Sequence, residues 1–353
     1  MPRDLSPGLP RPAGPPVAGT YPENPVLARV WRGAFVESQH RGAWVLADTD
    51  GRVVEGVGDF ERGYFARSSI KCLQALPLLE SGAAERFGFD SAEVALAVSS
   101  HNAEPCHTQG VERILARVGL GAEALQCGPQ APGDPAARRE LERAGAEPSA
   151  LHNNCSGKHA GFLALSRHLG AAPAEYLAPE GEVQRRVRQA VADMTGAPSG
   201  ALEEATDGCS APTFRLPLCG IATAFARVAN PEGLEAGRRA ACERMLAAVA
   251  ENPVMIAGRH QRICTDLARV GAGRLFPKIG GEALYGIGVR GAGRGIALKV
   301  DDGSYRGFHA LIVSLLERFG FLDGEEVRAL EKWRGARLEN WAGRAVGRIE
   351  VVA

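Results

Sequence analysis

The chain has 353 residues, and Lys+Arg and Asp+Glu both total 41, so the formal net charge is zero. No overall field attracts nucleic acid or anionic lipid, and we expect neither as a partner. Hydrophobic residues make up 45% and charged residues 23%, as in ordinary globular proteins. No apolar run approaches the roughly 20 residues that a membrane-spanning helix requires.

The first 23 residues are rich in Pro, Gly and Arg and show no periodicity, which predicts a flexible tail. They contain no apolar segment of the kind that a secretory signal needs, so we expect a cytoplasmic protein. The eight cysteines are then best interpreted as reduced thiols or metal ligands, because cytosolic disulfides are rare. We expect residues 24–353 to form a single catalytic unit.

Loose apolar alternation over residues 26–60 predicts antiparallel strands, and a near-helical spacing that begins at Ser68 predicts a helix ending at Gly82. Residues 105–270 are expected to be mostly helical. Helices are predicted there over residues 110–118, 135–146, 159–168, 183–194 and 234–250. A late hairpin over residues 283–301 and a helix over 309–319 complete an α+β fold, an antiparallel sheet closed by both ends of the chain and flanked by helices.

Lysine is scarce: of the 41 basic side chains 36 are Arg, and the five lysines are Lys71, Lys158, Lys278, Lys299 and Lys332. Arginine stays protonated in proteins, whereas burial or a neighbouring cation can make lysine neutral. A general base or a neutral nitrogen ligand must therefore remain lysine. Lys332 lies in a charge-rich stretch and is expected on a solvated helix face.

The first candidate motif is Ser68–Lys71, where strand-like sequence passes into a helix. Residues three apart share a helix face, so a neutral Lys71 can take the proton of Ser68 and release a nucleophile. Serine is also an ordinary helix N-cap, and the spacing alone does not choose between the two interpretations.

Two further elements follow in chain order, Ser100–Asn102 and Lys278–Gly280. With Ser68–Lys71 they resemble the SxxK, SDN and KTG set that surrounds the acylated serine of β-lactamases and penicillin-binding proteins. Ile279 lacks the hydroxyl of KTG, which argues against a β-lactam substrate. Taken alone, Ser100 and Asn102 are typical of a turn at a strand end.

A third group combines Cys155 and Lys158 with Cys209. Two thiolates suit zinc, and a dication can hold a lysine amine neutral. The spacing is not a CxxC pair, so reduced buried thiols are the alternative. His101, His152 and His159 lie in or beside these motifs, although a structural role is the more frequent outcome for a single histidine.

Several strings together resemble the rhizobial-type, class 3 or asparaginase II family of L-asparaginases. They are RSSIKCLQALPLLESGAAERFG, AVSSHNAEP, LHNNCSGKHAGFLAL, DGCSAPTFRLPL, KIGGEALYGIG and GIALKVDDGSYRG. The similarity runs from about Pro25 to Phe308, and NNCSGKHAG is its most specific part. Cys72, Ser210 and the segment Pro179–Gln184 depart from residues frequent in the family.

The resemblance implies a serine β-lactamase-like fold, a homodimer, and hydrolysis of L-asparagine to L-aspartate and ammonia. It also implies a zinc ion on Cys155, Lys158 and Cys209. The family's two Ser–Lys pairs fall on Ser68 with Lys71 and on Ser100 with Lys278. Its further matching positions, with the polar residues of the same motifs, are candidate substrate contacts: Arg67, His101, Asn102, His159, Asp207 and Glu282.

In the mechanism that we predict, Ser68 attacks the amide carbon with Lys71 as general base, and Lys278 deprotonates or tunes Ser100. Arg67 is expected to bind the α-carboxylate, and Asp207 or Glu282 the α-ammonium. The catalytic motifs specify acyl transfer but not side-chain length, so a glutaminase or another serine amidase is the nearest alternative. A zinc-stabilised protein that binds asparagine without turnover is the alternative of another class.

Overall fold

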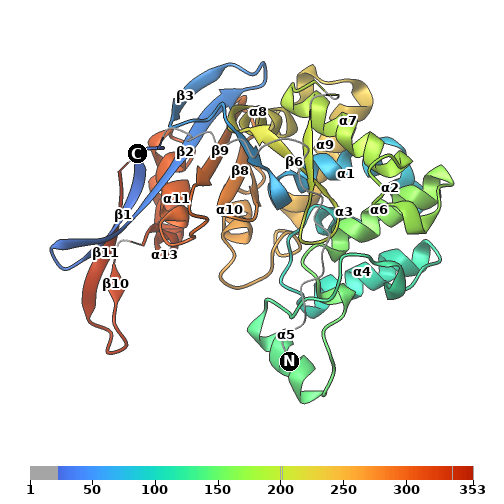
Figure 1. Cartoon of the computed structure of the whole chain (residues 1–353), viewed down its shortest axis with the longest axis horizontal. Helices are drawn as coiled ribbons and strands as arrows, with labels where there is room; N and C mark the ends of the chain where they lie inside the picture. Colours follow the sequence, from blue (N-terminus) through green and yellow to red (C-terminus); the bar gives the residue numbers. More distant parts are fainter. Residues whose placement is uncertain (1–22, 199, 201, 336, 353) are drawn as a thin grey trace, which may run out of the picture.

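The computed structural model describes residues 23–198, 200, 202–335 and 337–352 (Figure 1). Apart from Glu23, the predicted tail lies outside the described residues. The fold is mixed α/β, with an antiparallel sheet and many helices, as the sequence predicts. None of the helices in the described part of the chain is long and apolar enough to span a membrane.

The main sheet has eight strands in the order β10-β11-β1-β2-β9-β8-β7, with β3 paired to β2. Its strands are β1 (Val26–Arg32), β2 (Phe35–Asp48), β3 (Val53–Val57), β7 (Leu275–Ile279), β8 (Leu284–Val289), β9 (Arg294–Val300), β10 (Leu338–Glu339) and β11 (Ala345–Val351). The early strands and the late hairpin are confirmed. Because β1 pairs with both β2 and β11, both ends of the described chain close the sheet, as predicted.

A smaller sheet of three strands, in the order β4-β6-β5, joins the region before the first helix to the middle of the chain. Its strands are β4 (Gly63–Phe65), β5 (Glu203–Thr206) and β6 (Pro212–Pro217). The turn between β5 and β6 carries Asp207 and Cys209. The pairing of β4 with β6 places this turn beside the start of the first helix, because Ala66 N donates to Phe214 O.

Most of the helices lie on the side of the molecule away from the extended strands, whereas those over residues 308–318 and 331–334 lie beside the sheet (Figure 1). The longer ones are α1 (Lys71–Glu80), α3 (Ser91–Ala97), α4 (Pro105–Arg117), α5 (Pro135–Arg143), α6 (Ser156–Leu169), α7 (Glu182–Thr195), α8 (Leu218–Ala229), α9 (Ala236–Glu251), α10 (Ile263–Gly271) and α11 (Phe308–Arg318). The short ones include η1 (Arg67–Ile70), α2 (Ala83–Arg86), α12 (Gly324–Ala329) and α13 (Glu331–Arg334). The helix predicted from Ser68 therefore begins as a 3-10 turn, and the one predicted from residue 110 begins at Pro105.

Helix α8 covers one face of the main sheet and α11 the other. On the α8 face, a Cβ at Gly286 would overlap the ring of Phe225, so glycine is what allows the helix to approach. The next residue back along β8, Tyr285, points to the opposite face and packs against Phe308, with ring centroids 5.8 Å apart. The alternation of side chains along a strand thus builds two packed layers on one sheet.

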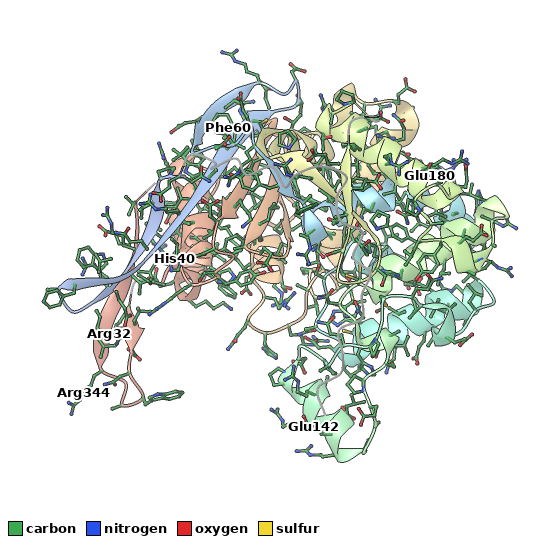
Figure 2. All side chains as sticks on the ribbon, viewed as in Figure 1. Arg32, His40, Phe60, Glu142, Glu180 and Arg344 are labelled. Atoms are coloured by element: carbon green, nitrogen blue, oxygen red, sulfur yellow. The ribbon has the colours of Figure 1, made fainter. Side chains whose placement is uncertain are left out.

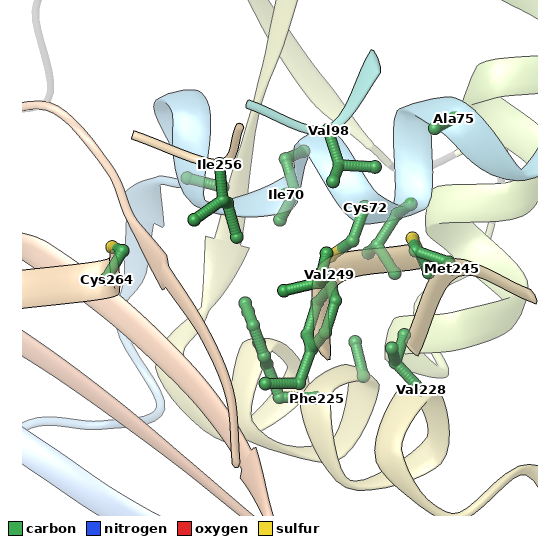
Figure 3. Close-up of a cluster of buried hydrophobic side chains, with 14 of the residues drawn as sticks. Ile70, Cys72, Ala75, Val98, Phe225, Val228, Met245, Val249, Ile256 and Cys264 are labelled. Carbon is green, nitrogen blue, oxygen red and sulfur yellow. The ribbon is translucent and has the colours of Figure 1, made fainter. Parts of the chain in front are cut away.

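Helix α1 lies at the centre of the helical side and is buried along nearly its whole length. Figure 3 shows Cys72 of α1 packed among Phe225 of α8 and Val249 of α9, so that one core joins the helices to the sheet. A helix enclosed in this way has little freedom to shift. The residues at the N-terminus of α1 are therefore held in a fixed position between the main sheet and the other helices.

The strands β1, β2, β10 and β11 extend beyond the body as an arm (Figure 1). Figure 2 labels Arg32 and Arg344 on this arm and His40 where it joins the body. Its turns expose large apolar side chains, since Phe35 is 80% and Trp341 is 107% exposed.

Candidate active site

A cavity of about 800 Å³ opens where η1, β7 and the turns before α6 and α10 meet. Residues with reactive or polar side chains in its lining include Arg67, Ser68, Ser100, Gln130, Asn154, Cys155, Asp207, Cys209, Arg262, Cys264, Tyr305 and His309. These residues come from seven separate stretches of the chain. The fold thus brings the sequence motifs around Ser68, Ser100, Cys155 and Cys209 to one place.

Lys71 is wholly buried below the cavity and points toward the loop that follows α3. Its Nζ lies 2.6 Å from Ser99 O, 3.1 Å from Ser100 Oγ and 3.2 Å from Asn154 O. A neutral amine has two N–H donors and one lone pair. The two carbonyls can take the donors, which leaves the lone pair for the hydroxyl of Ser100.

Lys278 approaches the same hydroxyl from β7. Its Nζ lies 2.7 Å from Ser100 Oγ and 2.9 Å from Ile279 O, and the side chain is 0% exposed. Ser100 Oγ therefore lies between the amines of two buried lysines. Within the described residues neither amine has a carboxylate within ion-pair distance.

The protonation of these amines follows from their surroundings. Burial, together with the charge of Lys71, lowers the pKa of Lys278 to about 7. Burial also lowers the pKa of Lys71 from its ordinary value. A lysine with such a pKa can take up and release a proton near neutral pH, which an exposed lysine cannot do.

Ser68 differs from Ser100 in its contacts. It lies in η1, lines the cavity and is half-buried. Within the described part of the chain its hydroxyl makes no hydrogen bond, and the predicted contact with Lys71 is not formed. The physical reason is that the buried amine of Lys71 finds its partners in the Ser99–Ser100 segment and Asn154 O.

The backbone beside Ser68 is strained. Arg67 has φ 50°, and Ser210 and Gln261 in the same cavity lining have φ 68° and 52°. Residues other than glycine rarely adopt this left-handed region, and such residues cluster at functional sites. Arg67 is fixed there by Nε, which donates to Oδ1 of Asp207 at 2.5 Å. Arg67 and Asp207 thus form a charge pair on the cavity wall.

Cys155, Lys158 and Cys209 lie together at the cavity, each at most 4% exposed. Lys158 Nζ lies 3.1 Å from Cys209 Sγ, and Cys209 hydrogen-bonds Cys155, which lowers the pKa of the Cys155 thiol. Two sulfur atoms and a nitrogen in mutual contact suit a thiophilic ion such as zinc. The residues present therefore fit the implied metal.

A second set of ligand-type atoms lies at the start of α4, away from the motifs singled out in the sequence for metal binding. Atoms of Glu104, Cys106 and His107 lie within 4.8 Å of one another. The carboxylate of Glu104 is already occupied, since it accepts from Asn102 Nδ2 at 3.0 Å and from the backbone N of Arg259 at 2.6 Å.

The other predicted substrate contacts are not brought to the cavity lining. His101 is buried, with Nδ1 accepting from Ala103 N and Nε2 2.9 Å from Ser156 Oγ. Asn102 donates to Glu104, and His159 Nδ1 lies 2.7 Å from the hydroxyl of Tyr176. Burial lowers the pKa of both histidines well below the ordinary value. Glu282 is exposed beside the cavity, immediately after Gly281 of its lining.

Among the cavity residues that the sequence did not single out are Arg262, Tyr305 and His309. Arg262 Nη2 donates to Ser100 O at 2.6 Å. Because the chain has 36 arginines, the low residue count that singled out the lysines does not single out Arg262. Tyr305 and His309 stack with ring centroids 6.1 Å apart, and only the fold places them beside Ser68 and Ser100.

The sequence model of L-asparaginase II matches residues 28–351, which is nearly all of the described chain. The chain belongs to the L-asparaginase II family. Membership in this family supports an amidohydrolase, a hydrolase that acts on an amide of a small molecule. No curated protein sequence matches the chain.

Similar solved structures include two of Mglu in its native form. One, in 4.3 M NaCl, is 16% identical with a TM-score of 0.43 and covers 81% of this chain and 63% of Mglu. The other is 17% identical with a TM-score of 0.41 and covers 86% of this chain and 70% of Mglu. In the first comparison the chain thus spans less than two thirds of the Mglu chain, and a likeness at these scores carries no conclusion about function.

Proposed function

We propose that the protein is an L-asparagine amidohydrolase that releases L-aspartate and ammonia by Ser–Lys acyl transfer. The observation that carries the proposal is the position of Ser100 Oγ between the amines of Lys71 and Lys278 beside a cavity that Ser68 also lines. A hydroxyl between two titratable amines is suited to moving a proton. The arrangement is also our ground for proposing a serine β-lactamase-like active site.

In the proposed reaction Ser68 Oγ attacks the side-chain amide carbon, and its proton passes to the neutral amine of Lys71. The proton then passes through Ser100 Oγ to the amide nitrogen, the C–N bond breaks, and ammonia leaves. Water, deprotonated by the same route, attacks the ester and releases L-aspartate with the Ser68 hydroxyl restored. Ser68 suits the attack because it is half-buried at the cavity wall, and catalytic hydrogen bonds often form only with substrate present.

A second candidate nucleophile is Ser100, because its hydroxyl is the one that both lysines contact. In that mechanism Lys278 takes the proton of Ser100, and Lys71 gives one to the leaving ammonia. Both mechanisms use Lys71, and they differ in the serine that is acylated and in the lysine that takes its proton. Identification of the acylated peptide by mass spectrometry separates them.

We propose that zinc is held by Cys155, Lys158 and Cys209. Bound there, the ion would be neutralised by the two thiolates and would tie the turn before α6 to the β5–β6 turn. Lys71 remains the residue that moves protons, and its Nζ is also fixed by Ser99 O. We further propose a cytoplasmic homodimer, on the family resemblance.

The test of the proposed function is ammonia release from L-asparagine and from L-glutamine by the purified protein. We expect turnover of asparagine and little of glutamine. Equal or greater turnover of glutamine would instead favour the glutaminase alternative. Calorimetric binding of asparagine with no ammonia released would favour a binding protein.

The zinc proposal is tested by elemental analysis of the wild type, Cys155→Ala and Cys209→Ala. We expect about one zinc per chain in the wild type and a large decrease in each variant, because a site of three ligands rarely survives the loss of one. Cys242→Ala is the matched control, since that buried thiol is remote from the cavity lining. Zinc content that is unchanged in one of the test variants removes that cysteine from the ligand set.

A further inference from the structure

Two arginines line the cavity, and they differ in their electrostatic partners. Arg67 is paired with Asp207, so the two charges compensate each other. Arg262 forms no ion pair with any residue that the structure describes. Its side chain makes one hydrogen bond, from Nη2 to the backbone oxygen of Ser100. The remaining N–H groups of its guanidinium are available to an anion in the cavity.

The local fold holds Arg262 in place. It precedes the first turn of α10 and follows Gln261, whose φ is 52°. The same segment begins at Ile256, whose carbonyl accepts the amide of Ser100 at 3.0 Å. Ser100 is therefore held at its backbone N by one end of the segment and at its backbone O by the other. The guanidinium is fixed on the backbone oxygen of the serine whose hydroxyl both lysines contact.

The positive charge of Arg262 also lowers the pKa values of neighbouring side chains. Burial, with the charge of Arg262 as the second cause, lowers the pKa of His309 to about 4. Arg262 also contributes, after burial and Lys71, to the lowered pKa of Lys278. These side chains are therefore largely neutral above pH 7, whereas an arginine remains charged. Arg262 is the permanent, uncompensated cation of this wall.

We propose that Arg262 binds the α-carboxylate of the substrate, the role that we expected from the sequence for Arg67. The inference rests on the proposed function, because it takes the substrate to be a free amino acid. The α-carboxylate of a free amino acid then meets, in Arg262, a guanidinium of the cavity lining that has no carboxylate partner among the described residues. Planar guanidinium and carboxylate groups also match in geometry and form two parallel hydrogen bonds.

This anchor also gives a reason for selectivity. A carboxylate held at Arg262 fixes the distance from that carboxylate at which the amide carbon must lie to be attacked by Ser68 or Ser100. Glutamine has one more methylene group than asparagine, so its amide carbon lies at a different distance from the anchored carboxylate. A misplacement of about 1 Å can reduce a rate by about 100-fold.

The experiment compares Arg262→Ala and Arg262→Lys with the wild type on L-asparagine and on 3-aminopropanamide, which is asparagine without its α-carboxylate. We expect Arg262→Ala to reduce kcat/KM for asparagine by about 30-fold or more beyond its effect on 3-aminopropanamide, mainly through KM. Arg262→Lys should lie between the two. Arg269→Ala, on the exposed side of the same helix, is the control. Equal losses on both substrates would show that Arg262 only supports Ser100, and would overturn the proposal.

A binding measurement separates this inference from the proposed function. By calorimetry the wild type should bind L-aspartate at least about 30-fold more tightly than β-alanine, which lacks the α-carboxylate, and Arg262→Ala should lose this preference. Absence of asparagine turnover in the wild type would end the proposed function, whereas the preference for L-aspartate would still support the carboxylate site. Equal binding of both ligands, or binding of neither, overturns it.

Discussion

The two serines of the cavity occupy opposite environments. The hydroxyl of Ser100 is held between Lys71 and Lys278, and the residue is only 6% exposed. The hydroxyl of Ser68 has no hydrogen-bond partner among the described residues and lies on the cavity wall. One hydroxyl is fixed where protons can move, and the other is placed where a substrate can reach it.

The difference indicates a division of labour. A nucleophile must approach the substrate carbon, and a group that relays protons must keep its partners through the reaction. The SxxK spacing suggests that Lys71 serves Ser68 directly, but in the structure its amine contacts Ser100. We therefore expect Lys71 to connect the two serines.

The largest effect is expected from Ser68→Ala, which should reduce kcat by about 10⁴-fold or more because it removes the nucleophile. Ser100→Ala should cost about 10²- to 10⁴-fold, since it removes a proton path but not the attacking atom. Steady-state ammonia release measures both. An aspartyl adduct found on Ser100, with Ser68→Ala retaining acylation, would reverse the two roles.

The next effect concerns the lysines. Lys71→Arg and Lys278→Arg keep a positive charge but remove the amine that can become neutral, so each should lose about 10²- to 10⁴-fold in activity. Lys332→Arg is the matched control, because that side chain is 58% exposed and pairs with Asp266 at 2.8 Å. Near-normal turnover in folded Arg variants at positions 71 and 278 would rule out the Ser–Lys mechanism.

A smaller effect is expected in the pH profile. Because the pKa of Lys278 is lowered to about 7, its neutral form predominates above that pH and is lost below it. We expect kcat/KM to fall about tenfold per unit as the pH decreases below about 7.

The residual activity of Lys278→Arg should not show this decrease at low pH, because arginine does not titrate in that pH range. Lys332→Arg should retain it. A decrease that is unchanged in Lys278→Arg would be assigned to another group.

Scarcity and motif together predicted much of the cavity from sequence. The chain has 36 arginines and five lysines, and three of these lysines, Lys71, Lys158 and Lys278, are buried at 3% exposure or less. Lys299 is also buried, at 9%, although it lies outside the cavity lining and no role was predicted for it. The motif strings placed Ser68, Ser100, Cys155 and Cys209 in one site because each lies at an element end that faces the same space.

What could not be predicted depends on long-range geometry. The hydrogen bond from Arg262 to Ser100 joins residues 162 positions apart, and the residue types do not predict it. Likewise, the two residues of β10 are too few for any periodicity to show. His101 and His159 were predicted as substrate contacts because they lie within the motifs. In the structure their ring nitrogens contact the hydroxyls of Ser156 and Tyr176, and no local sequence pattern predicts these partners.

The closure of the main sheet by β1 and β11 affects how the molecule is made. Val30 pairs with Ile349, and the Lys278–Ser100 contact spans 178 positions, so neither the sheet nor the proton path can assemble until most of the chain has left the ribosome. Topologies with such distant pairings fold slowly and leave strand edges open to aggregation meanwhile. Synthesis therefore passes through a long interval in which β1, β2 and β3 are made but their partner strands β9 and β11 are not.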